Sequence, residues 1–214
     1  MKQLFYLHLE MIYTYLALGD SYTIGEQVNL AESFPYQTVQ RLRQTTVGDW
    51  QFTAPEIIAK TGWTTDELNA AIQQTTLLTQ YDVVSLLIGV NNHYRARSAA
   101  AFKDEFTQLL QKAIAFAGGN SKNVFVLSIP DWGITPFAQG RDREKIANEI
   151  DAFNQVCKNV SATFLCTYID NTASQREDGN KMDFLAGDGL HPSSKEYAKW
   201  ADKLSAAIGA KLNR

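Results

Sequence analysis

Five short apolar runs, separated by amphipathic stretches, place the strongest constraint on what this 214-residue chain can fold into. Each run is almost continuously apolar, which is typical of strands that are buried on both faces of a sheet. Neighbouring parallel strands need crossover connections, and the stretches between the runs are long enough to supply them. The runs are Tyr13 to Leu18, about Pro55 to Ala59, Val83 to Ile88, Val124 to Ile129 and Thr163 to Ile169.

The stretches between the apolar runs carry helical patterns and helix end signals. Asp66 and Glu67 fit the first turn of a helix, and Gly118-Gly119 fits a helix end. Regular alternation of strand and helix predicts one parallel sheet with helices on both faces. The predicted helices are Pro35 to Thr45, Thr65 to Leu78, Ser98 to Ala117, Arg141 to Val160 and about Pro192 to Leu212.

No repeat, low-complexity tract or linker divides the chain. A chain of this length buries enough surface to hold a core without disulfides or a structural metal. We therefore expect a single domain over residues 13–214, preceded by an N-terminal extension over residues 1–12. Since Met11 stands directly before the first predicted strand, we expect a chain beginning at Met11 to fold.

The composition excludes several classes of partner and cofactor. With 20 Lys and Arg against 23 Asp and Glu, the net charge is -3, so we expect no nucleic-acid partner. Two cysteines and three histidines are too few for a Cys-rich zinc site, and we expect no metal and no organic cofactor. Cys157 and Cys166 are expected to be buried thiols rather than a disulfide.

The N-terminal apolar run from Leu4 to Leu18 could be taken for a targeting segment. His8 and Glu10 interrupt it, and it falls short of the roughly 20 apolar residues that a spanning helix needs. No small-residue cleavage site follows it. We therefore expect a cytoplasmic protein without stable membrane insertion.

Polar residues follow the predicted strands at the points where a parallel sheet would gather them along one edge. Ligands of such sheets bind at the carboxyl ends of the strands. The segments supply a hydroxyl, a backbone donor, an amide and a carboxylate-imidazole pair, which together suffice for acyl transfer. They are Gly19-Asp20-Ser21, Thr61-Gly62-Trp63, Gly89-Val90-Asn91-Asn92 and Asp188-Gly189-Leu190-His191.

With these four blocks in this order, the chain resembles the SGNH hydrolases, also called the GDSL esterase/lipase superfamily, from Tyr13 to about Gly209. The resemblance implies a flavodoxin-like three-layer α/β/α sandwich with a five-stranded parallel sheet. It also implies that Ser21 is the nucleophile, that His191 is the base and that Asp188 orients His191. The implied oxyanion hole consists of the Ser21 N–H, the Gly62 N–H and the Asn91 side chain.

The residue types suit this chemistry on physical grounds. A serine hydroxyl needs a base within hydrogen-bond reach, and the spacing of Asp188 and His191 lets a short loop fold the carboxylate back to the imidazole. The Asn91 amide donates without bearing a charge. Taken alone, Asp188 and Ser21 could instead be helix-capping residues, and Gly62 could simply make a turn.

Residues around these blocks are candidates for substrate binding. Asn92 stands where aspartate is usual in the family, so we expect an altered loop or altered pocket polarity, with an intact oxyanion hole. Two tryptophans, Trp63 and Trp132, either line an acyl pocket or are ordinary packing residues. Trp132 lies within the segment 131–137. For His93, Tyr94, Arg95 and Arg97 we expect a solvated helix-entry segment, with contact to a polar or anionic part of the substrate as the alternative.

Other α/β classes lack their defining residues here. The Gly-x-Ser-x-Gly elbow of α/β-hydrolases, the Gly-x-Gly-x-x-Gly fingerprint and the P-loop are missing. A receiver domain would need an Asp where the third strand ends in Gly89, and the residues after Ser21 imitate a flavin phosphate loop only faintly.

We therefore predict a serine esterase or lipase that cleaves carboxylic esters through an acyl-Ser21 intermediate. Simple esters or lysophospholipid-like substrates are expected, because Ile88 to Asn92 and Ser128 to Trp132 resemble bacterial lysophospholipase-like chains. A carbohydrate O-deacetylase or thioesterase of the same fold is the alternative. A non-catalytic binding protein with a vestigial site is an alternative from another class, and the oligomeric state is not predicted.

Overall fold

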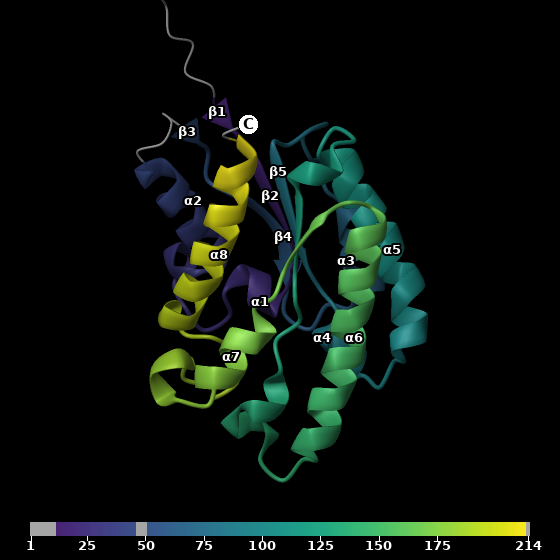
Figure 1. Ribbon diagram of the computed structural model, residues 1–214, viewed down its shortest axis with the longest axis vertical. Coiled ribbons are helices and arrows are strands. Elements are labelled where there is room, and N and C mark those ends of the chain that lie inside the picture. Colours follow the sequence, from purple (N-terminus) through teal and green to yellow (C-terminus); the bar gives the residue numbers. More distant parts are fainter. Residues whose placement is uncertain (1–11, 46–50, 213–214) are drawn as a thin grey trace, which may run out of the picture.

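The computed structural model describes residues 12–45 and 51–212, and Figure 1 shows a central sheet between two layers of helices. The sheet has five strands, and every neighbouring pair is parallel. Numbered along the chain, its strand order is 2-1-3-4-5, the flavodoxin-like order, so the predicted fold class is confirmed. In spatial order the strands are β4 (Glu56–Lys60), β2 (Tyr15–Asp20), β5 (Val83–Leu87), β6 (Val124–Leu127) and β7 (Thr167–Ile169).

Each face of the sheet is covered by its own group of long helices (Figure 1). α2 (Phe34–Gln44) and α8 (Ser194–Leu212) pack together on one side. α3 (Thr65–Gln74), α5 (Ala99–Phe116) and α6 (Arg143–Thr163) lie on the other side. Because both faces are covered, every residue of β2, β5 and β6 is buried, which explains their nearly continuous apolar sequences.

Short helices lie in the connections, several of them directly after strands. α1 (Ser21–Ile24) begins where β2 ends, and α4 (Val90–Tyr94) begins three residues after β5. This arrangement gathers the segments that follow the strands at the carboxyl edge of the sheet. The remaining short helices are α7 (Thr172–Asp178) and the 3-10 turns η1 (Leu30–Glu32), η2 (Ser121–Asn123), η3 (Trp132–Ile134), η4 (Pro136–Ala138) and η5 (Met182–Phe184).

Some predicted boundaries are wrong. The last strand was expected from Thr163, but α6 continues through Thr163, and only residues 167–169 are strand. The helix persists because Phe153, Cys157 and Val160 continue its buried face at helical spacing. α3 ends at Gln74 rather than Leu78, and α7 was not predicted at all.

The secondary structure at the start of the described chain also differs from the prediction. Ile12, assigned to the extension, lies in β1 (Ile12–Tyr13), which pairs in parallel with β3 (Gln51–Phe52) in a separate two-stranded sheet. The main strand β2 starts only at Tyr15, two residues after the predicted start at Tyr13. The rest of the predicted extension, residues 1–11, lies outside the described residues.

Two further expectations concern the thiols and the membrane. Cys157 is a buried free thiol as predicted, whereas Cys166 is also free but only half-buried. Burial raises the pKa of Cys166 to about 11, so neither thiol is prone to ionise at neutral pH. Among the described residues, no helix combines the length and the apolar character needed to cross a membrane.

Candidate active site

Ser21 is held at the tip of β2 by a tightly capped single turn of helix. The Asp20 carboxylate accepts a hydrogen bond from the Tyr22 N–H at 3.1 Å and so caps the start of α1. Gly25, with φ of +76°, ends the helix in the left-handed conformation that glycine adopts without a steric penalty. Only 5% of Ser21 is exposed, so the turn that carries it is packed against the rest of the protein.

The loop before α8 brings a carboxylate and an imidazole to this hydroxyl. Asp188 Oδ1 accepts the backbone N–H groups of Leu190 and His191, each at 3.0 Å, which folds the loop back on itself. His191 Nδ1 lies 2.5 Å from Asp188 Oδ2, and His191 Nε2 lies 3.0 Å from Ser21 Oγ. Because a carboxylate only accepts, Nδ1 carries the proton and Nε2 is left as the acceptor for the serine hydroxyl.

The charge of Asp188 supports this arrangement. Partial burial raises its pKa, but hydrogen bonds from the His191 side chain and from the backbone N–H groups of His191 and Leu190 outweigh that effect and lower the pKa overall. The carboxylate is therefore ionised at neutral pH. Three residues predicted from sequence thus form one hydrogen-bonded chain, although Ser21 and His191 are 170 positions apart.

Gly62 and Asn91, the other two predicted site residues, line the same cavity of about 170 Å³ as Ser21 and His191. Gly62 has φ of +83°, and its N–H donates no hydrogen bond within the described part of the chain. The Asn91 amide donates one hydrogen bond to the Trp63 carbonyl at 3.0 Å. An amide nitrogen carries two hydrogens, so Asn91 retains a second donor for a ligand.

Aromatic side chains form a wall of this cavity. Trp132, Tyr94 and Phe137 all line it, with ring centroids 5.4 Å apart for Tyr94 and Trp132 and 6.1 Å apart for Trp132 and Phe137. The Trp132 indole N–H donates to His93 Nδ1 at 3.2 Å, which fixes the orientation of the indole. Trp132 and Tyr94 also line a second, larger cavity of about 650 Å³.

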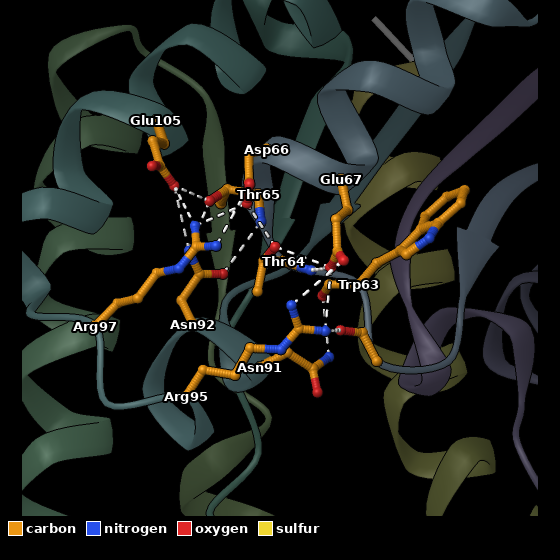
Figure 2. A network of polar contacts seen from close by, with 11 residues as sticks. Trp63, Thr64, Thr65, Asp66, Glu67, Asn91, Asn92, Arg95, Arg97 and Glu105 are labelled. Carbon is orange, nitrogen blue, oxygen red and sulfur yellow. Dashed lines mark hydrogen bonds and ion pairs between the residues drawn. The ribbon is translucent and has the colours of Figure 1, made fainter.

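Two predicted substrate-binding residues lie elsewhere. Asn92 is fully buried, accepts the Thr65 N–H at 3.1 Å and donates to Thr65 Oγ1 at 2.6 Å and Glu105 at 3.3 Å. Its side chain therefore supports the start of α3 instead of the pocket, which corrects the prediction. Trp63 does not line the cavity, and Figure 2 shows its indole directed away from Asn91 and Asn92.

The expectation of a solvated segment after Asn92 is wrong for His93. His93 is 8% exposed, and its Nε2 lies 2.8 Å from Glu149 on α6. The two residues are 56 positions apart, so no local spacing could reveal the pair. Tyr94 is about half exposed, and Arg95 and Arg97 keep partly exposed side chains that form ion pairs.

Tyr94, for which substrate contact was the alternative to a solvated position, lines the cavity. It follows Asn91 by three positions on α4, a spacing that brings residues i and i+3 together. Sequence reasoning missed Leu190, which lines the cavity beside His191. Within residues 12–45 and 51–212, no three His, Cys, Asp or Glu side chains gather in a way that could hold a metal ion.

Comparisons with known proteins give a family match and solved structures of the same fold. Residues 17–199 match the GDSL-like Lipase/Acylhydrolase family. Similar solved structures include TesA (18% identity, TM-score 0.70, covering 92% of this chain and 98% of that one). A lipase/acylhydrolase from Enterococcus faecalis is 19% identical, with a TM-score of 0.70 and coverage of 93% and 96%. The acetylxylan esterase Axe2 from Geobacillus stearothermophilus is 18% identical, with a TM-score of 0.71 and coverage of 92% and 94%. A search of curated proteins finds no match.

Proposed function

Since this chain belongs to the GDSL-like Lipase/Acylhydrolase family, we propose that it is a serine esterase in which Ser21 is the nucleophile, His191 the general base and Asp188 the residue that orients His191. One observation carries the assignment of roles. The Ser21 hydroxyl, the His191 ring and the ionised Asp188 carboxylate form a continuous hydrogen-bonded chain at the wall of a cavity. This arrangement can activate a hydroxyl that is otherwise a weak nucleophile at neutral pH.

Acylation begins when Ser21 Oγ attacks the ester carbonyl and His191 Nε2 takes the hydroxyl proton. Asp188 holds the imidazolium that forms. The carbonyl oxygen becomes negatively charged, and the N–H groups of Ser21 and Gly62 and the Asn91 amide are the proposed donors to it. When the tetrahedral intermediate collapses, His191 returns the proton to the leaving alkoxide, and the acyl group stays on Ser21.

Deacylation repeats these steps with water. His191 Nε2 takes a proton from the attacking water, the acyl-serine bond breaks, and the same proton returns to Ser21 Oγ. The products are a carboxylic acid and the restored enzyme. No step needs a group other than the residues described and water.

The cavity favours short acyl groups. Its volume of about 170 Å³ lies below the roughly 300–1,000 Å³ that is typical of sites for drug-sized ligands. We therefore propose esters of short acids, including O-acetylated sugars such as those implied by the name of Axe2, as the main substrates. A lysophospholipid or a thioester with a short acyl part would react by the same steps.

A fluorophosphonate probe tests the assignment of the nucleophile. The wild type should be labelled on Ser21, as located by peptide mass spectrometry, and should hydrolyse p-nitrophenyl acetate. A folded Ser21→Ala protein should lose both reactions. Retained turnover in that variant would contradict the proposal. A folded wild type without labelling or turnover across an acyl ester series would favour a binding protein with a vestigial site.

We also propose a cytoplasmic location. Cys157 and Cys166 are both free thiols, which suits a reducing compartment. Cell fractionation with an antibody against the native protein tests the location, and recovery outside the cytoplasmic fraction would contradict it.

A further inference from the structure

The connection between β4 and α3, residues 61–64, carries Gly62, and three side chains from one neighbouring segment hold its backbone and that of Thr65. Asn91 donates to the Trp63 carbonyl at 3.0 Å, and Asn92 accepts the Thr65 N–H at 3.1 Å. Arg95 Nη2 donates to the Gly62 carbonyl at 2.7 Å. Figure 2 shows these side chains reaching from one side into the turn. Residues 91–95 thus fasten the backbone of residues 62–65.

Of these contacts, the one from Arg95 acts directly on Gly62. Glycine has the widest conformational freedom of any residue, and φ of +83° alone does not fix the direction of its peptide groups. Gly62 has no side chain that could anchor it. The Gly62 carbonyl belongs to the peptide group shared with Trp63, and the Gly62 N–H belongs to the peptide group shared with Thr61. A donor that holds the first group restricts rotation about the φ and ψ bonds of Gly62, and so limits how far the second group can turn.

Arg95 is itself oriented by the start of α3. Its guanidinium lies 3.3 Å from the Glu67 carboxylate, and Glu67 in turn accepts the Thr64 N–H at 2.9 Å. The planar guanidinium has several donors in fixed directions, so one group can serve the Gly62 carbonyl and the Glu67 carboxylate together. Arg95 therefore connects Gly62 to a capped helix end.

We propose that Arg95 is a positioning residue for the oxyanion hole, which keeps the Gly62 N–H directed at the carbonyl oxygen of the bound ester. This inference rests on the proposed esterase function. Arg95 touches no reacting atom and acts through Gly62. Its contribution is greatest in the transition state, when the negative charge on the oxygen has developed.

Arg97 provides a matched control on the same segment. Its side chain is 31% exposed against 46% for Arg95, and it also forms ion pairs with the α3 region. Its partners are Asp66 at 2.7 Å and Glu105 at 3.4 Å. None of its hydrogen bonds in the described residues reaches Gly62, so removal of Arg97 takes away a comparable charge without releasing the Gly62 carbonyl.

The test compares Arg95→Met with Arg97→Met in steady-state hydrolysis of p-nitrophenyl acetate. We expect Arg95→Met to lower kcat by about tenfold and to leave KM within about twofold, because a misdirected donor loses part of the roughly 10²- to 10³-fold effect of one oxyanion contact. Arg97→Met should keep kcat within about twofold of the wild type. Fluorophosphonate labelling should slow in Arg95→Met only.

A double-mutant cycle with Gly62→Ala separates positioning from a general structural effect. An added Cβ at Gly62 would meet only Arg95 Nη2, at 3.9 Å, so the alanine has space and acts through backbone strain. If Arg95 works through Gly62, Arg95→Met in the Gly62→Ala background should lower kcat by less than about threefold. An additive loss of about tenfold in that background would overturn the proposal.

Two further outcomes are decisive. If the wild type is active and a folded Arg95→Met protein has unchanged kcat, the role of Arg95 is overturned. If the wild type itself is inactive and unlabelled, the proposed function is overturned instead. If Arg95→Met does not unfold cooperatively, Arg95→Lys replaces it. The lysine ammonium lacks the planar, fixed donors with which the guanidinium binds the Gly62 carbonyl and the Glu67 carboxylate together. In Arg95→Lys, kcat should therefore still fall by at least about threefold. Unchanged kcat in Arg95→Lys overturns the proposal as well.

Discussion

Two histidines in this fold are paired with carboxylates, but only one of them has a ring nitrogen free to act on a substrate. His93 Nδ1 accepts the Trp132 indole N–H, and its Nε2 faces Glu149, so both nitrogens are occupied by structural partners. In His191 one nitrogen faces Asp188, and the other faces the Ser21 hydroxyl. A carboxylate partner alone therefore does not identify a catalytic base. The partner of the second ring nitrogen distinguishes His191 from the structural histidine His93.

Asp188→Asn should lower kcat by about 10⁴-fold in a folded protein. An amide can present a donor to His191 Nδ1, which moves the ring proton to Nε2 and removes the acceptor for the serine proton. Glu149→Gln is the matched control, and it should keep kcat within about threefold because His93 takes no part in the reaction. Equal losses in both variants would contradict the distinction between the two pairs.

Asp20 behind the nucleophile makes stability depend on pH. Complete burial raises the pKa of this carboxyl to about 7, and its Oδ2 has no hydrogen-bond partner among the described residues. The folded state therefore binds a proton that the unfolded state has already released. Between about pH 4 and pH 7, the Asp20 contribution to the free energy of unfolding should fall as the pH rises.

Asp20→Asn should remove this dependence, because an amide keeps the acceptor for the Tyr22 N–H but does not ionise. When the pH is raised from 5 to 8, the wild type should lose stability through Asp20 and the variant should not. Relative to the wild type, the free energy of unfolding of the variant should therefore rise by at least about 1 kcal/mol. Urea unfolding at the two pH values measures it. A difference that is the same at both would show that Asp20 is not protonated in the folded state at pH 5.

At the scale of elements, the junction between β5 and α4 depends on the absence of a side chain at Gly89. Its φ is +129°, and an added Cβ would lie 2.7 Å from both Ile129 Cδ1 and Phe102 Cε2. The packing of these two side chains over the backbone fixes where α4 begins. The start of α4 in turn places Asn91 in the cavity wall, so the first glycine of this motif has a packing role.

Gly89→Ala should lower the free energy of unfolding by more than about 3 kcal/mol, since it adds overpacking to an unfavourable backbone conformation. Gly119→Ala is the control, because Gly119 also has positive φ, at +80°, but an added Cβ there would meet nothing within 4 Å. It should cost only about 1 kcal/mol. Chemical denaturation of both variants measures the difference, and similar losses would refute the packing argument.

The elements themselves were largely predictable because burial on both faces leaves a direct trace in the sequence. β2, β5 and β6 coincide closely with predicted apolar runs, whereas the edge strand β7 was predicted too long at its start. The residues around 163 are compatible with helix and strand alike. Packing of α6 against the sheet decided in favour of helix, and local sequence could not contain that information.

At the scale of the whole molecule, the cavity exists only because separate connections meet at one edge of the sheet. In the cavity wall, Ser21 follows β2, Gly62 follows β4, Asn91 follows β5 and His191 precedes α8. Trp132 comes from the connection after β6. Trp132 and Tyr94 stand between the cavity of about 170 Å³ and the cavity of about 650 Å³. We propose that Trp132 limits the size of the acyl group.

Trp132→Ala should join the two cavities and shift the preference among p-nitrophenyl esters from acetyl and butyryl toward longer chains. In the wild type, kcat/KM for the decanoyl ester should be at least about tenfold below that for the butyryl ester, and the variant should reduce this ratio. Phe137→Ala, at the exposed rim, should change the ratio less. A wild type that prefers the decanoyl ester would refute the proposed limit.

Burial periodicity and short motifs are local properties of the chain, so the five main strands, the long helices between them, the confirmed family resemblance and the four motifs could be predicted from the sequence. The contacts between polar side chains far apart in the chain could not. The tertiary structure joined His93 to Glu149, turned Asn92 toward Thr65 and placed Arg95 on the Gly62 carbonyl. These contacts depend on how α3, α4 and α6 pack on one face of the sheet, and that packing is set by the complete core rather than by any one segment.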